Sequence, residues 1–281
     1  MISNRARIIL KTMKRKLLAS VFICAALAPA FSAAANNGYN PKINRLVWSD
    51  EFDGSGMLDG SKWGYEEGYI RNKEAQFYTR EDSKNVRREN GILTIEAHKA
   101  ADGKITSGSV NTLGKFDFLY GRVEVRAKVP KGRGTWPAIW MMGTDIKKVG
   151  WPKCGEIDIL EQVGFNPKSF QANVHTYGSI RLDKNGKYSI PKGWKKIFEN
   201  YEDWHTYALE WYPDTLKFFY DGEFIGEYKK DDKYPEHWHF NKPMYLLINL
   251  AIGGSWGGQK GIDNAIFPAR YEIDWVRYYK E

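Results

Sequence analysis

Apolar residues recur at every second position over most of the chain, which is the pattern of strands with one buried face. Residues 121–129, GRVEVRAKV, alternate cleanly, with aliphatic side chains on one face and charged side chains on the other. Residues 92–98, 206–211 and 271–279 behave similarly. No window of about 12 residues combines a helical apolar stripe with capping residues. The pattern therefore predicts an all-β protein.

Turn signals separate these predicted strands. Asp221-Gly222 lies between aromatic and branched residues and predicts a two-residue hairpin turn. Residues 178–203 are rich in turn-forming residues and predict a long loop, which we expect at the rim of a cleft. Many short, aromatic-rich strands are typical of a two-sheet antiparallel sandwich or a jelly roll.

The first 35 residues have the three parts of a secretory signal peptide. Six Lys or Arg residues come first, residues 17–31 are apolar, and SAAA at 32–35 supplies the small residues of a cleavage site. The apolar part is shorter than the roughly 20 residues that span a bilayer. We therefore predict a signal peptide at 1–35 and a single domain at 36–281. The mature protein is expected to be secreted or periplasmic and not anchored in a membrane.

Removal of this segment changes what the charge implies. The six basic residues account for most of the formal net charge of +8, which falls to about +2 in the mature chain. A nucleic-acid partner suggested by the high pI is therefore not expected. Of the two cysteines, only Cys154 remains, so the mature chain has no intrachain disulfide. We expect Cys154 to be a small packed residue rather than a nucleophile, and the protein to be a monomer.

The stretch at 154–162, CGEIDILEQ, contains three carboxylates in a segment that otherwise reads as a buried strand. Strict alternation places Glu156 and Asp158 on one face but turns Glu161 into the core. An unpaired buried carboxylate is unfavourable. A one-residue bulge near Ile159 or Leu160 removes the conflict, because two residues then share one pleat position. The sequence therefore predicts a bulge that returns Glu161 to the face of Glu156.

Two glutamates on one face, with an aspartate between them, have the chemistry of a retaining glycosidase, whose two carboxyl groups lie roughly 5 to 5.5 Å apart. Like charges this close separate their pKa values, so one group can act as an acid and the other as a nucleophile. Two other interpretations stay open. The acids could form a solvated face, or they could hold a cation such as Ca²⁺, which takes six to eight oxygens that one strand cannot supply.

Tryptophan is abundant, with 11 residues in the chain. Sugar rings stack on aromatic faces, so an aromatic groove beside two carboxylates suits a glycan. Each tryptophan could equally be packed in the core. The tryptophans around and after the carboxylate motif are Trp136, Trp140, Trp151, Trp194, Trp204, Trp238 and Trp256.

These residues lie in a region that resembles glycoside hydrolase family 16, in its laminarinase-like branch. The resemblance is carried by GKFDFLYGRVEVRAKVPKGRGTWPAIWMMG at 114–143 and GWPKCGEIDILEQVG at 150–164. That branch has E-I-D-I-x-E, with one residue more than the lichenase-type branch. Further similar stretches are LVWSDEFDG at 46–54, RNKEAQFYT at 71–79, NVHTY at 173–177, WHTYALEW at 204–211, NLAIGGSWGG at 249–258 and YEIDWVRYY at 271–279.

The resemblance implies a β-jelly-roll sandwich with a concave substrate cleft and the endo-hydrolysis of β-glucans with retention of configuration. It implies Glu156 as nucleophile, Glu161 as general acid/base and Asp158 as their assistant, with no cofactor in the chemistry. The other implied substrate-binding residues are Trp136, Trp140 and Trp151 on the donor side, His175 near the acceptor side, Asn72 at a sugar hydroxyl, and Trp256. A structural Ca²⁺ ion at Asp274 is also implied.

One departure concerns the substrate. Members of the family often have an arginine where this chain has Ser109. The resemblance implies laminarin, a β-1,3-glucan, and mixed-linkage β-1,3/1,4-glucan as substrates. Two alternatives are a non-catalytic β-glucan-binding protein and a family 16 hydrolase that acts on an algal galactan. A basic rim at Lys192, Lys195 and Lys196 keeps an anionic substrate open.

Overall fold

The computed structural model describes residues 38–178, 181–182, 188–189 and 193–281. The predicted signal peptide lies outside the described residues, and so do Lys192 and part of the predicted loop at 178–203. Residues 37–281 form one compact unit. Within the described ranges, no helix is both long enough and apolar enough to cross a membrane.

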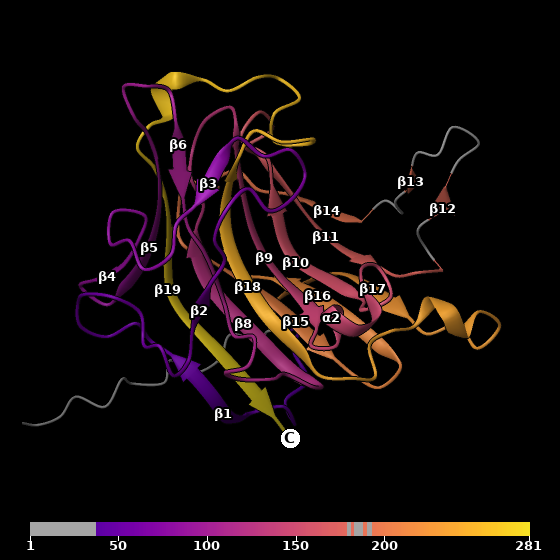
Figure 1. Cartoon of the computed structure of the whole chain (residues 1–281). Helices are drawn as coiled ribbons and strands as arrows, with labels where there is room; N and C mark the ends of the chain where they lie inside the picture. Colours follow the sequence, from indigo (N-terminus) through magenta and orange to yellow (C-terminus); the bar gives the residue numbers. More distant parts are fainter. Residues whose placement is uncertain (1–37, 179–180, 183–187, 190–192) are drawn as a thin grey trace, which may run out of the picture. The chain divides into compact units, whose positions relative to one another are not determined.

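The described residues form two large sheets that are almost entirely antiparallel (Figure 1). We call the ten-stranded one the supporting sheet; its only parallel pair among the described strands is β3 with β6. Its strand order is β17 (Glu223–Lys229), β16 (Thr215–Tyr220), β15 (His205–Trp211), β8 (Gly121–Lys128), β19 (Ala269–Lys280), β5 (Ile92–Lys99), β6 (Ile105–Ser107) and β3 (Gln76–Tyr78), with β1 (Arg45–Asp50) beside β19 and β4 (Val86–Glu89) beside β5.

The second sheet, called the cleft sheet below, has seven strands among the described residues. Their order is β14 (Trp194–Ile197), β11 (Ser169–His175), β10 (Glu156–Gln162), β9 (Thr135–Gly143), β18 (Met244–Ile252), β7 (Ser109–Asn111) and β2 (Gly64–Tyr65). The smaller elements are the strand pair β12 (Arg181–Leu182) and β13 (Tyr188–Ser189), the short helix α2 (Ile146–Val149), and the 3₁₀ turns η1 (Pro235–His237) and η2 (Asn264–Ile266).

The predicted all-β sandwich is confirmed, and one hydrophobic core contains residues from both sheets. In β8 the four aliphatic side chains of the alternating pattern are all buried. The charged face of the same strand is not solvated as alternation suggests, because Arg122 and Glu124 are also buried. They pair with each other, and Arg122 also lies 3.5 Å from a carboxylate oxygen of Glu210. Paired charges can be buried where isolated charges cannot.

The two turn predictions have different outcomes. Asp221 and Gly222 both have positive φ, 48° and 78°, and join β16 to β17 as the predicted hairpin. The segment predicted as a loop at 178–203 instead contains β14, which pairs with β11 at the edge of the cleft sheet. Periodicity does not reveal this strand because it has only four residues, which alternate between half-buried and exposed.

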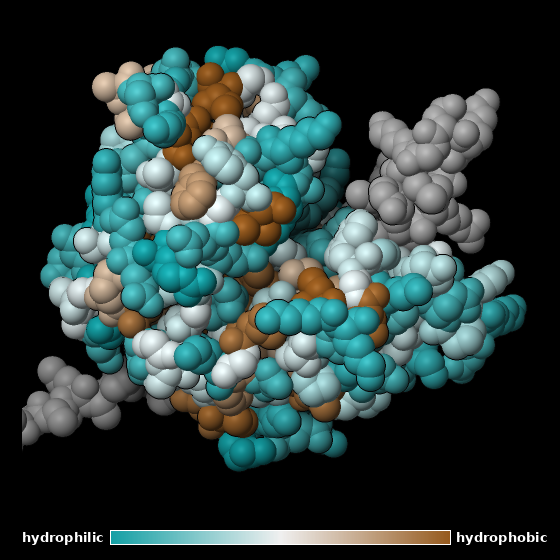
Figure 2. Space-filling model, in the orientation of Figure 1, coloured by the Kyte–Doolittle hydropathy of each residue, from teal (hydrophilic) through white to brown (hydrophobic). Residues whose placement is uncertain are grey.

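Hydrophilic residues predominate on the face drawn in Figure 2, and hydrophobic residues form small separate patches among them. Some large apolar side chains remain exposed on the described surface. These include Tyr69, Trp151, Tyr177 and Tyr234, each between 41% and 67% accessible. Isolated exposed apolar residues are common in monomeric proteins.

Candidate active site

A cavity of about 1070 Å³ lies over the cleft sheet, with β10 and β9 in its floor. Its size suits several sugar units, since pockets for drug-sized ligands span roughly 300 to 1,000 Å³. Figure 1 shows β9, β10 and β18 side by side in the middle of this sheet. The cavity lining includes every substrate-binding and catalytic residue predicted from the sequence, namely Asn72, Trp136, Trp140, Trp151, Glu156, Asp158, Glu161, His175 and Trp256.

The predicted bulge in β10 is confirmed. Against β9, Asp158 is opposite Trp140 and Leu160 is opposite Ile139, so one extra residue is accommodated between them. The register against β11 shifts in the same place. Ile159 and Leu160 are both in the core, 1% and 0% exposed, and Glu161 lies in the wall of the cavity. The strand therefore presents all three carboxylates to one cavity.

Glu156 is held by two side chains that favour its ionised form. Trp151 Nε1 donates a hydrogen bond of 2.7 Å to Oε2, and His175 Nε2 lies 3.6 Å from Oε1. Burial and the charge of Asp158 act in the opposite direction and raise the pKa of Glu156 to about 7. Glu156 is therefore an ionisable group whose charge changes near neutral pH.

Glu161 has fewer stabilising contacts. Trp136 Nε1 donates a hydrogen bond of 3.2 Å to Oε1. Burial and then the charge of Asp158 raise the pKa of Glu161 well above its ordinary value. Its carboxyl group thus retains a proton at a pH where an exposed glutamate would have lost it, as a general acid requires.

His175 lies on β11 directly opposite Glu156 and joins the acids. Its Nε2 is 3.0 Å from Asp158 Oδ2. Burial by itself lowers the pKa of His175, but Asp158, Glu156 and Glu161 outweigh burial and raise it to about 10. The imidazolium therefore offsets part of the negative charge in the cavity.

The aromatic residues are fixed by neighbouring side chains. Trp140 Nε1 donates to Asn249 Oδ1 at 2.7 Å, and Trp256 packs edge-on against Trp136 with ring centroids 5.5 Å apart. Trp151 is 41% exposed, so its ring is accessible at the rim. Asn72 donates to Glu74 Oε1 at 3.3 Å. The tryptophans Trp194, Trp204 and Trp238 do not line the cavity.

The cavity also contains residues that the sequence did not single out. Gln171 and Asn173 share the face of His175 on β11, and period-two alternation in SFQANVH could have found them. Lys195 lines the cavity, whereas Lys196 pairs with Glu223. The remaining residues of this kind come from loops or adjacent strands without a distinct pattern; they include Glu66, Arg71, Tyr245 and Asn249.

Asp274 lies in β19 of the supporting sheet, away from the cavity lining, and its carboxylate pairs with the Arg126 guanidinium. Among the described residues, the cluster of side chains suited to a metal is Glu156, Asp158 and His175, which does not include Asp274. A carboxylate neutralised by a guanidinium does not fit the oxygen-rich shell of Ca²⁺. We derive no step from calcium here, and its presence at Asp274 stays a prediction.

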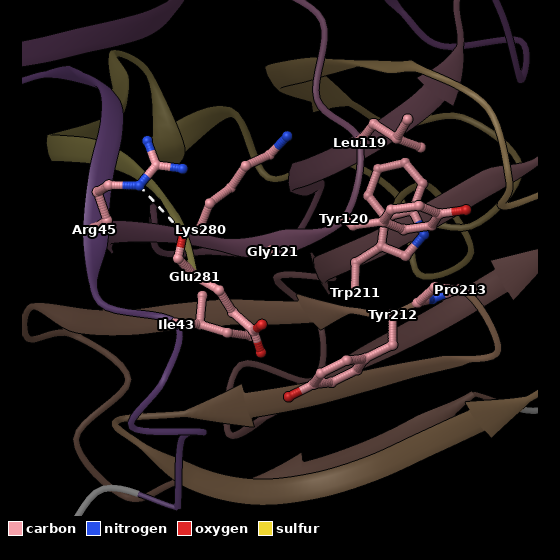
Figure 3. A pocket seen from close by; sticks show the side chains of 10 residues that line it. All are labelled: Ile43, Arg45, Leu119, Tyr120, Gly121, Trp211, Tyr212, Pro213, Lys280 and Glu281. Atoms are coloured by element: carbon pink, nitrogen blue, oxygen red, sulfur yellow. Dashed lines mark hydrogen bonds between the residues drawn. The ribbon is translucent and has the colours of Figure 1, made fainter.

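A second cavity, of about 350 Å³, is shown in Figure 3. It lies where β1, the end of β19 and the turn after β15 meet, and Arg45 Nε donates to the main-chain oxygen of Glu281 there. Of the described residues that line it, only Glu281 has a carboxylate side chain. This cavity therefore lacks the paired acids of glycoside hydrolysis. Cys154 is buried, and burial raises the pKa of its thiol to about 11, so it is not a nucleophile.

A β-sandwich that brings two glutamates, an aspartate and several tryptophans into one open cleft has the make-up of a glycoside hydrolase. The comparison with known families agrees. Residues 73–277 match the model of glycosyl hydrolases family 16, and the chain belongs to this family.

Three relatives illustrate the similarity. The chain is 38% identical to a beta-glucanase of Rhodothermus marinus, over 96% of this chain and 97% of that protein. The crystal structure of the laminarinase from Rhodothermus marinus superposes with a TM-score of 0.77 at 40% identity, over 84% of this chain and 97% of that one. SCLam, a non-specific endo-β-1,3(4)-glucanase with a 1,3-β-D-cellobiosyl-glucose at its active site, has a TM-score of 0.76 at 39% identity, over 84% and 95% of the two chains.

Proposed function

We propose that this chain is a retaining endo-β-glucanase that hydrolyses β-1,3-glucan and mixed-linkage β-1,3/1,4-glucan. The observation that carries the proposal is the bulged strand β10, which presents Glu156, Asp158 and Glu161 to one aromatic cleft. The named activities of the relatives support the same substrate class. A non-catalytic binding protein would not need this set of acids.

In the proposed mechanism, Glu156 attacks the anomeric carbon while Glu161 protonates the departing oxygen. A glycosyl-enzyme ester forms at Glu156 and the sugar leaving group departs. Water then attacks the anomeric carbon, Glu161 takes its proton, and Glu156 is released as a carboxylate. Asp158 and His175 keep Glu156 in place, since both contact it or its partner directly.

The strand order gives the direction of the substrate. By resemblance, Trp136 and Trp140 on β9 are donor-side residues and His175 on β11 is an acceptor-side residue. These two strands flank β10, so a glucan chain that crosses the strands meets the donor residues on one side of the acids and the acceptor residues on the other. We further propose that the mature protein acts outside the cytoplasm as a monomer.

The assignment is tested by substituting the two glutamates. Glu156→Gln and Glu161→Gln are each expected to lower kcat on barley β-glucan and laminarin by roughly 10²- to 10⁴-fold. A dinitrophenyl β-glycoside needs little protonation of its leaving group, so it should restore the first step in Glu161→Gln but not in Glu156→Gln. Near-parental activity in either variant would contradict the assignment. Cleavage of agarose instead of β-glucan would contradict the substrate class.

A further inference from the structure

The donor half of the cleft contains a charged arm whose function the mechanism above does not use. Arg71 and Glu66 both line the cavity and form an ion pair. The second carboxylate oxygen of Glu66 accepts a hydrogen bond of 2.6 Å from Ser109 Oγ on β7. The residue that departs from the family pattern is therefore part of the support for this arm.

The arm is held beside a substrate-binding ring. The Arg71 guanidinium carbon lies 4.9 Å from the centroid of Trp140 and 6.0 Å from that of Tyr78. Trp140 is tied through Asn249 to the Tyr78 hydroxyl, with hydrogen bonds of 2.7 and 2.9 Å. The guanidinium and the indole thus form one rigid unit in the cavity wall.

The backbone next to Arg71 is in a restricted conformation. Asn72 and Lys73 both have positive φ, 55° and 53°, and Glu74 N donates back to Arg71 O at 3.1 Å. These are the features of a type I′ turn, which is unfavourable for a non-glycine residue such as Lys73. The next residues fasten this turn, since Ser255 N donates to Asn72 O and Ala75 N donates to Ile252 O. The chain therefore maintains a strained turn at the point that places Arg71 in the cavity.

One donor of Arg71 lacks a partner. Nη2 contacts Glu66, but Nη1 is buried and has no hydrogen-bond partner among the described residues. A buried unpaired donor is unfavourable by about 1–3 kcal/mol, so such groups call for an explanation. The side chain is 20% exposed and lines the cavity, so a ligand hydroxyl can supply the missing acceptor.

We propose that Arg71 is a specificity-determining residue that selects a 4-linked glucose unit over Trp140; this deepens the glucanase function proposed above and rests on it. The two N–H groups of Nη1 suit two neighbouring acceptors. A glucose unit substituted at O4 offers adjacent hydroxyls on C2 and C3. A unit substituted at O3 offers hydroxyls on C2 and C4, which are not adjacent. The pairing with Glu66 neutralises the arm, which fits a neutral glucan rather than a sulfated or acidic one.

The proposal is tested with kcat/KM on mixed-linkage barley β-glucan and on laminarin, which lacks 4-linked units in its main chain. Arg71→Lys keeps the charge beside Glu66 but loses the planar fork. We expect its kcat/KM to fall about 10-fold more on barley β-glucan than on laminarin, the change given by a lost hydrogen bond to a charged group. Arg71→Met with Glu66→Gln removes the ion pair without leaving a lone buried charge, and should show the same selectivity.

Arg80→Lys is the matched control, because Arg80 pairs with Glu67 at half-exposed positions outside the cavity lining. It should leave both kcat/KM values unchanged. Equal losses on the two glucans in both Arg71 variants would show that Arg71 only supports Trp140, and would overturn the proposal. No loss in either variant would overturn it as well. If the parent protein cleaves neither glucan, the proposed function itself fails.

Discussion

The ionisation of single residues determines how the cleft responds to pH. Glu156 must be ionised to attack, and its pKa is raised to about 7 by burial and the charge of Asp158. Glu161 must carry a proton, and its pKa is raised well above the ordinary range. kcat/KM should therefore rise as Glu156 loses its proton and fall at higher pH as Glu161 loses its own, because kcat/KM follows the groups of the free enzyme.

Removal of the imidazolium should move only the acidic limb of this profile strongly. The positive charge of His175 favours ionised Glu156, so His175→Gln raises the pKa of Glu156 and the pH at which activity begins. We expect kcat/KM to fall more at pH 5.5 than at pH 8, by about 10-fold for each unit by which the limb moves. Trp151→Phe, which removes the hydrogen bond to Oε2, should shift the limb in the same direction. Unchanged acidic limbs in both variants would contradict this electrostatic account.

At the scale of an element, the bulge in β10 makes the site possible. It puts two successive residues, Ile159 and Leu160, into the core. Ile159→Ala and Leu160→Ala should therefore each lower the free energy of unfolding by about 2–5 kcal/mol. In a regular strand one of the two would face the cleft and tolerate the change. Gln171→Ala, on the cleft face of the neighbouring β11, is the control and should change the free energy of unfolding by less than about 1 kcal/mol. Urea denaturation of the three variants gives the comparison.

This bulge could be predicted from the sequence because a charge in the wrong register is physically conspicuous. Strands with regular alternation, such as β8 and β19, could be predicted for the same reason. The ion pair of His175 with Asp158 could not, since it depends on the pairing of β11 with β10. Arg71 could not either, because it lies in a turn whose conformation is fixed by hydrogen bonds to residues 252 and 255. Side chains placed by loops leave no periodic signal.

At the scale of the whole compact unit, the two sheets divide the work between them. The cleft sheet carries the raised pKa values of Glu156 and Glu161, which are unfavourable for stability at neutral pH because burial opposes their ionised forms. The supporting sheet carries charges that are paired. Arg122 is bonded to Glu124, and its guanidinium lies 4.5 Å from the ring of Tyr39 and 4.9 Å from that of Tyr279. One buried arginine thus connects segments near both ends of the compact unit.

Loss of this arginine should therefore be a large effect on stability and a small one on catalysis. Arg122→Met leaves Glu124 and the nearby Glu210 without their cation in buried surroundings, which should cost about 3–5 kcal/mol. Arg126→Met is a matched control on the same strand and face: its pair with Asp274 is partly exposed, so we expect a loss of at most about 1 kcal/mol. Urea denaturation measures both, and kcat at a temperature where both variants stay folded should match the parent. Equal losses in the two variants would show that the buried cluster around Arg122 does not hold the sheet together. A lowered kcat in folded Arg122→Met would show that stability and catalysis are not divided between the sheets.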